Sequence, residues 1–197
     1  MLQVPETLAE RASQDLGARG RSWVEHLPEV IAAAVRHWSL TPQSALPVGK
    51  ELSILIAVTT AAGHPAVLKA SYPDAKPRHE AAALSRWAGN GAAALLRADP
   101  VRGLLLLEQL AARTSLRAED DASALLVAAR VLRQLWVPPG QHSFPEQADR
   151  LSRWLTLIPG RHRRLGSPFE PELLHAAMTA ARNLTVASGL LVLLHGD

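Results

Sequence analysis

The sequence contains no cysteine, and only one tyrosine and two phenylalanines occur among its 197 residues. The lack of cysteine excludes a disulfide scaffold and any cysteine-ligated zinc or iron–sulfur site. No segment has the roughly 18 continuous apolar residues of a membrane-spanning helix. The N-terminus also lacks the basic start and apolar run of a signal peptide. We therefore expect a compact cytoplasmic protein with no membrane partner.

The sequence also lacks a large excess of positive or negative charge. Its 21 basic residues are nearly balanced by 18 acidic ones, and the formal net charge is only +3. The pI of about 9.9 mainly reflects arginine, since only Lys50, Lys69 and Lys76 are lysines. The dense basic run 161–164 lies between Pro-Gly and Gly-Ser-Pro and is predicted to be a solvated loop. Four tryptophans fall on apolar stripes and are predicted to be core residues, so no nucleic-acid partner is expected: Trp38, Trp87, Trp136 and Trp154.

The periodicity of apolar residues predicts an α+β fold in three segments. Residues 1–43 form an N-terminal helical segment, with apolar residues at helical spacing. Residues 44–110 form a small antiparallel sheet: alternation over 46–58, a turn at 61–65 and a returning arm at 66–70 predict one hairpin. A helix that ends at 89–91 follows, and two apolar runs, 92–96 and 104–107, predict a second hairpin.

Residues 111–197 are predicted to be mainly helical. Three amphipathic stripes cover 125–136, 151–158 and 173–184, and the second is expected to end at Pro159-Gly160. A run of five apolar residues, 190–194, is predicted to be a short buried strand. It leads directly into His195-Gly196-Asp197.

Lys69 and Glu80 are the first candidate functional pair. Lys69 shares one face of its predicted strand with Val67 and Ser71, where a lysine is ordinarily solvated. Glu80 lies on the apolar stripe of the following helix, so its carboxylate points toward the sheet and needs a cation. Alternatively, Glu80 belongs to the first helical turn, where the helix dipole and Arg78 favour it. Spacing alone leaves both interpretations open.

Two further places are candidates. The main chain at Glu108, Gln109 and Leu110 ends the leucine-rich strand and could contact a flat heterocycle, although most strand ends bind nothing. Asp197 follows a predicted buried strand and could accept a proton from a bound hydroxyl, or it belongs to a frayed polar terminus. The eight histidines show no metal-ligand spacing, so no metal site is assigned.

These features, taken in order, resemble the aminoglycoside phosphotransferase kinases. The segments AVLKASYPDAKPRHEAAALSRWAGNGAAALLRADPVRGLLLLEQL, ADRLSRWL and LLVLLHGD are similar to the aminoglycoside/hydroxyurea antibiotic resistance kinases. The resemblance covers most of residues 23–197.

The resemblance implies a protein-kinase-like fold, in which a small antiparallel-sheet lobe with one helix precedes a mainly helical lobe. It also implies transfer of the γ-phosphoryl group of ATP to a hydroxyl of a small molecule, by family default a streptomycin-like aminoglycoside. Lys69 would contact the nucleotide phosphates and Glu80 would hold Lys69. Glu108, Gln109 and Leu110 would form the adenine-binding linker, and Asp197 would be the catalytic aspartate.

The sequence departs from the family pattern after Asp197. Family members continue with a loop ending in asparagine and then a second acid, which hold Mg²⁺, and with helices that build the acceptor pocket. We therefore expect a truncated helical lobe and a chain that is inactive, or nearly so, by itself. The alternative interpretation is a non-catalytic binding or partner module with a kinase-like shape.

Overall fold

The computed structural model describes residues 4–46, 51–110, 116–141, 143–186 and 191–195. The chain forms two compact units. The first contains the residues up to Val137 together with the segment that begins at Leu193, and the second spans Pro138–Val192. The N-terminal helices, the sheet and the first long helix of the predicted helical part all belong to the first unit.

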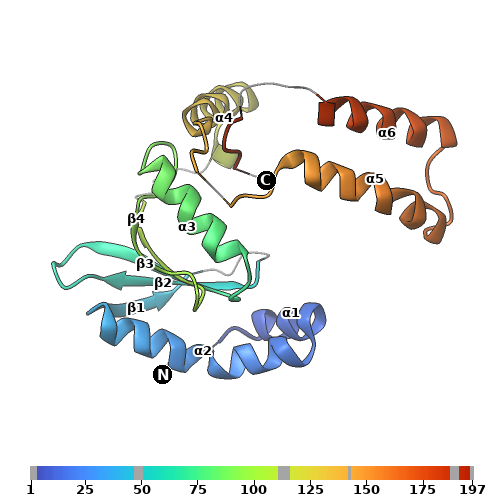
Figure 1. Ribbon diagram of the computed structural model, residues 1–197. Helices are drawn as coiled ribbons and strands as arrows, with labels where there is room; N and C mark the ends of the chain where they lie inside the picture. The colour runs from blue at the N-terminus through green and yellow to red at the C-terminus, as the bar shows by residue number, and fades with distance from the viewer. Residues whose placement is uncertain (1–3, 47–50, 111–115, 142, 187–190, 196–197) are drawn as a thin grey trace. The chain divides into compact units, whose positions relative to one another are not determined.

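The first unit is built on a five-stranded antiparallel sheet in the order β1-β2-β3-β5-β4 (Figure 1). Both predicted hairpins are present, because β2 pairs with β3 and β4 pairs with β5, but β2 begins at Ser53 and not at 46, and β4 begins at Leu95 and not at 92. The central pairing of β3 with β5 places Leu68 opposite Leu106 and Lys69 opposite Leu105. The strands are β1 (Thr41–Ala45), β2 (Ser53–Thr59), β3 (Pro65–Ser71), β4 (Leu95–Asp99) and β5 (Leu104–Glu108).

One face of the sheet is covered by α1 (Glu6–Leu16) and α2 (Ala18–His37), which precede it in the chain (Figure 1). Alternate residues of β2 and β3 point toward these helices, as strand geometry requires. They form one buried cluster with apolar residues of the helices. Its main members are Leu8, Leu27, Ile31, Trp38, Ile54, Ile56, Val58, Ala66, Leu68, Ala70, Leu104 and Leu106.

The other face carries α3 (Lys76–Trp87), which begins with Pro77 in its first turn and ends at Ala88 in the left-handed conformation (Figure 1). Proline suits a helix start because it needs no amide partner there. Leu84 and Trp87 are buried, as their spacing predicted. The helix contacts β4 and β5.

The later part of the chain is helical. It contains η1 (Leu116–Ala118), α4 (Asp121–Leu135), α5 (Gln147–Arg164) and α6 (Pro171–Val186). The predicted α+β class is thus confirmed. In the described part of the chain, a five-stranded antiparallel sheet is combined with six α-helices, which is consistent with a kinase-like fold. The division at residues 43 and 110 stays a prediction.

Three details of the sequence interpretation are wrong. Residues 41–43 were predicted to be helical, but Thr41–Ala45 form strand β1. This segment is extended because its main chain pairs with β2. Helix α5 continues through Pro159 to Arg164, so the basic run 161–164 is the last turn of a helix and not a loop. Proline removes one amide donor and its ring crowds the carbonyl group four residues earlier, which can kink a helix without ending it. Residues 191–194 form no strand.

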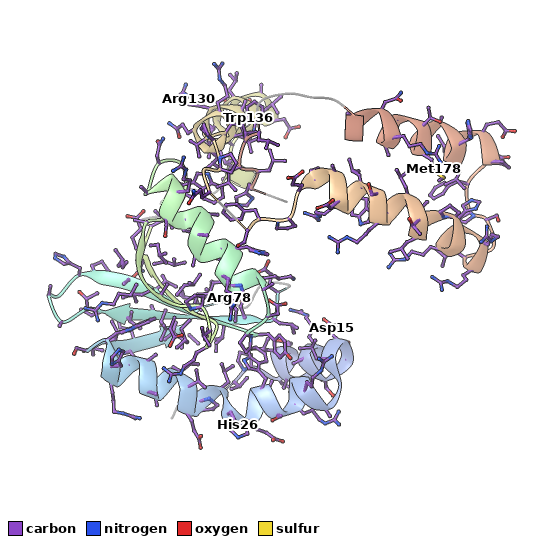
Figure 2. The ribbon with its side chains drawn as sticks, viewed as in Figure 1. Asp15, His26, Arg78, Arg130, Trp136 and Met178 are labelled. Carbon is purple, nitrogen blue, oxygen red and sulfur yellow. The ribbon has the colours of Figure 1, made fainter. Side chains whose placement is uncertain are left out.

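The predicted tryptophan core is half correct. Trp38 and Trp87 are buried, but the side chains of Trp136, labelled in Figure 2, and Trp154 are 53% and 54% exposed. Both exposed tryptophans belong to the later helical part, where a stripe of apolar residues predicted a helix correctly but not its burial.

Candidate functional site

Lys69 stands on the α3 side of the central strand β3. Its neighbours Leu68 and Ala70 point into the core under α1 and α2, so the alternation of the strand turns Lys69 toward the opposite face. There it is flanked by its register partners Leu55 and Leu105. Its side chain is only 14% exposed. A lysine held in this way needs a partner for its ammonium group.

Glu80 of α3 is that partner. The Lys69 Nζ donates to Oε1 at 2.8 Å and to Oε2 at 2.9 Å of Glu80, whose side chain is 33% exposed. The alternative placement, in the first helical turn, is wrong, since α3 begins at Lys76 and its first turn contains no acidic residue. Arg78, labelled at the start of α3 in Figure 2, is exposed. Of the two interpretations that the spacing left open, the structure has the ion pair that joins β3 to α3.

Glu51 is a second carboxylate near the same ammonium group, and the sequence interpretation missed it. Its Oε2 lies 3.5 Å from the Lys69 Nζ, and its side chain is 66% exposed. Glu51 lies in the connection between β1 and β2. The predicted alternation over 46–58 included Glu51, but β2 begins only at Ser53, and the alternation did not indicate which side chain Glu51 would meet.

Glu108, the last residue of β5, is hydrogen-bonded to Ala94, which directly precedes β4. Its Oε1 accepts a hydrogen bond from the Ala94 amide at 2.8 Å, and its own amide donates to the Ala94 carbonyl oxygen at 3.0 Å. The Glu108 amide is therefore already paired. Gln109 and Leu110 follow directly and are exposed. Their predicted role in binding adenine, together with that of Glu108, stays a prediction.

Asp197 lies outside the described residues, but the chain just before it is anchored. The Leu193 amide donates to the Val137 carbonyl oxygen at 2.9 Å, and Leu193 is buried. The His195 ring stacks on Trp87 of α3, with centroids 6.2 Å apart and an interplanar angle of 23°. The helix that carries Glu80 therefore also contacts the segment that leads to Asp197.

Trp87 adds a second contact at this junction. Its indole Nε1 donates to the Leu135 carbonyl oxygen, at the end of α4, at 2.9 Å. Glu80 and Trp87 are seven residues apart, which is about two helical turns and places both on one side of α3. One helix thus contacts the Lys69 ammonium group, the end of α4 and His195.

The described residues were compared with the requirements of a metal site and of a membrane-spanning helix. Among the described residues, no group of three or more histidine or acidic side chains is placed to hold a metal ion. No helix in the described ranges is both long and apolar enough to cross a bilayer.

Comparison with known proteins assigns the chain to a class. Residues 37–197 match the family described as aminoglycoside/hydroxyurea antibiotic resistance kinase. The match covers most of the chain, and the chain therefore belongs to this family, as the sequence resemblance indicated.

Particular relatives are similar to nearly the whole chain. It is 30% identical to a streptomycin 6-kinase of Streptomyces glaucescens and 32% identical to one of Streptomyces griseus. The alignments cover 96% and 100% of this chain, but 62% and 64% of those kinases. A hydroxyurea phosphotransferase of Kitasatospora aureofaciens is 32% identical over 96% of this chain and 56% of its own length. The chain thus spans about three fifths of the length of these curated relatives.

Proposed function

We propose that this chain carries the nucleotide-binding region of an ATP-dependent phosphotransferase. The observation that supports the proposal best is the ion pair between Lys69 and Glu80, in which both carboxylate oxygens accept from the ammonium group. A strand lysine fixed by a helix glutamate is the arrangement with which kinases position the phosphates of ATP.

The pair has a clear chemical use in phosphoryl transfer. The reaction requires mainly correct positioning and stabilisation of negative charge, because the protein forms no bond to the phosphoryl group. Glu80 keeps the Lys69 ammonium group on one side of α3 and limits its freedom before ATP arrives. Lys69 then holds the nucleotide phosphates with a charge whose solvation is already reduced, since its side chain is largely buried.

The acceptor is proposed to be a hydroxyl group of a small molecule. In the transfer step the acceptor oxygen forms a bond to the γ-phosphorus, the bond from that phosphorus to the bridging oxygen breaks, and ADP leaves. The hydroxyl proton passes to a base, for which we propose Asp197. Two relatives are named for streptomycin and one for hydroxyurea, and both compounds carry hydroxyl groups. We propose a streptomycin-like aminoglycoside as the first acceptor to test.

Calorimetric titration of the 197-residue protein with ATP tests the nucleotide-binding role. Lys69→Met removes the charge but keeps an unbranched side chain, and we expect it to weaken ATP binding tenfold or more, as the loss of one partly buried charge contact predicts. Lys76→Met is the matched control, because Lys76 is exposed at the start of α3. Equal ATP affinity of the unchanged protein and the Lys69→Met variant would contradict the proposal. A protein that binds no ATP would favour the non-catalytic partner module.

A second assay addresses turnover. Because the chain spans only part of the length of its relatives, we propose that these 197 residues alone bind ATP but transfer little or no phosphate to streptomycin. Measurement of ADP release with and without streptomycin checks this. Release well above that of Lys69→Ala would show that the chain is active by itself.

A further inference from the structure

The Lys69 ammonium group has three N–H donors, and the two carboxylates near it differ sharply. The Glu80 carboxylate accepts two short hydrogen bonds from it, at 2.8 and 2.9 Å. Glu51 makes one long ion pair at 3.5 Å. Two full negative charges therefore surround one positive charge before any ligand is present.

The two glutamates also differ in how they are held. The Glu80 side chain is one third exposed and projects from a helix that is packed on the sheet. The Glu51 side chain is two thirds exposed. Only its main chain is fixed nearby, since the carbonyl oxygen of the next residue, Leu52, accepts from the Tyr72 amide at 2.9 Å. The Glu51 carboxylate can therefore leave Lys69 at little cost, whereas Glu80 cannot.

We propose that Glu51 is a placeholder for phosphate, whose carboxylate contacts Lys69 until a polyphosphate displaces it. This inference rests on the proposed function, because it concerns the same ammonium group. A phosphate oxygen and a carboxylate oxygen compete for the same N–H donor of the Lys69 ammonium group. Glu51 would also repel the negative charge of the arriving nucleotide. Glu51 is thus a specificity-determining residue that weakens phosphate binding, while Glu80 strengthens it.

The test compares ATP, ADP and adenosine binding to the unchanged protein and to Glu51→Gln. The glutamine keeps the size of the side chain and removes its charge. We expect ATP and ADP to bind roughly two- to fivefold more tightly, the range for one largely exposed charge interaction. Adenosine has no phosphate, so its affinity should not change. The gain should shrink as salt is raised, because the charges are accessible to solvent.

Two matched variants sharpen the result. Glu29→Gln removes the same charge from an exposed position on α2, which covers the opposite face of the sheet, and should leave all three affinities unchanged. Glu80→Gln should weaken ATP binding, so the two carboxylates on one lysine have effects of opposite sign. Circular dichroism melting curves of the variants check that each is folded.

The possible results separate this inference from the proposed function. If Lys69→Met weakens ATP binding while Glu51→Gln leaves it unchanged or weaker, the nucleotide-binding role stands and the placeholder is wrong. Tighter adenosine binding in Glu51→Gln would also overturn the placeholder, since the effect would not depend on phosphate. If neither the unchanged protein nor Glu51→Gln binds ATP, both proposals fail.

Discussion

The sheet with α1–α3 and the later helices α4–α6 have similar amphipathic patterns in the sequence but very different burial. Most apolar residues of β2, β3 and β5 are buried between helices on the two faces of the sheet. In α4 only Leu135 is buried, and α5 has no buried residue. Periodicity thus predicts the type of element, whereas burial requires an apolar surface that faces it.

This contrast explains why the candidate site lies in the first region. A lysine and a glutamate hold each other reliably only when their strand and helix are fixed by packing. The core under α2 fixes β3, and the buried face of α3 fixes Glu80.

Gly103→Ala should produce the largest loss of stability. Gly103 has a φ of +75°, and a Cβ at this position would collide with the Ser71 carbonyl oxygen at the end of β3. We expect the free energy of unfolding to fall by about 4 kcal/mol, since strain and overpacking add. Gly166→Ala is the control in the later helices, because Gly166 has the same φ but no described heavy atom near its Cβ. It should cost only about 1 kcal/mol. Urea unfolding measures both, and equal losses would contradict the packing argument.

Leu68→Ala should have the next largest effect. Leu68 is fully buried between Ile56 and Leu106 in the centre of the sheet. Removal of its side chain should cost about 3 kcal/mol through lost burial and the remaining cavity. The matched change Leu126→Ala, at a side chain of α4 that is 70% exposed, should cost less than about 0.5 kcal/mol. A comparable shift of both urea midpoints would show that α4 buries Leu126 in solution.

Trp87→Phe tests the junction of α3 with the end of α4. The change keeps an aromatic ring but removes the indole donor to the Leu135 carbonyl oxygen. That oxygen still accepts from the Val137 amide, so it is not left unpaired. We therefore expect a loss of only about 1–2 kcal/mol in unfolding free energy. Trp154→Phe, in the exposed part of α5, is the control and should change stability little. A loss in Trp154→Phe as large as that in Trp87→Phe would contradict the assignment.

Asp120 should give the smallest effect, visible as a pH dependence. As the N-cap of α4 it accepts from the Ser123 amide at 3.0 Å. Hydrogen bonds from the Ser123 side chain and amide lower the pKa of the Asp120 carboxyl below its ordinary value of 3.8. The unfolded chain therefore takes up the proton first as the pH falls. The stabilising contribution is complete above the ordinary pKa and is lost as the pH falls through the lower pKa of the folded state.

Asp120→Asn removes this titration and retains a capping side chain. Between pH 6 and pH 2.5 the urea midpoint of the unchanged protein should therefore fall slightly more than that of Asp120→Asn. Glu119→Gln serves as the control, because Glu119 precedes the cap and is exposed. Identical pH profiles for the unchanged protein and Asp120→Asn would contradict the capping role.

Local patterns predicted the sheet region well. Alternation placed Ile54, Ile56 and Val58 on one buried face, and helical spacing turned Glu80 toward the sheet. The same rules failed where an element needs a distant partner. The apolar run before His195 forms no strand in its described residues, since a strand requires a neighbour to pair with its main chain.

The candidate site was therefore only partly predictable. Lys69 and Glu80 could be named as a candidate pair because both lie in elements with a clear period, but spacing alone did not decide whether they pair. The contact of Glu51 with Lys69 could not be recognised, because the predicted strand 46–58 gave no indication of what the polar residues between its apolar positions would contact. The stacking of His195 on Trp87 joins residues more than a hundred positions apart, and no local pattern indicates such a contact.

The order and type of most elements, the α+β class and the family follow from short-range periodicity and from motifs spaced along the chain. Which apolar stripes are buried depends on the fold, and the fold also brings Glu51 and Glu80 to the same ammonium group. Burial and ion pairing depend on surfaces and charges that meet in space, and the distance along the chain does not determine which of them meet.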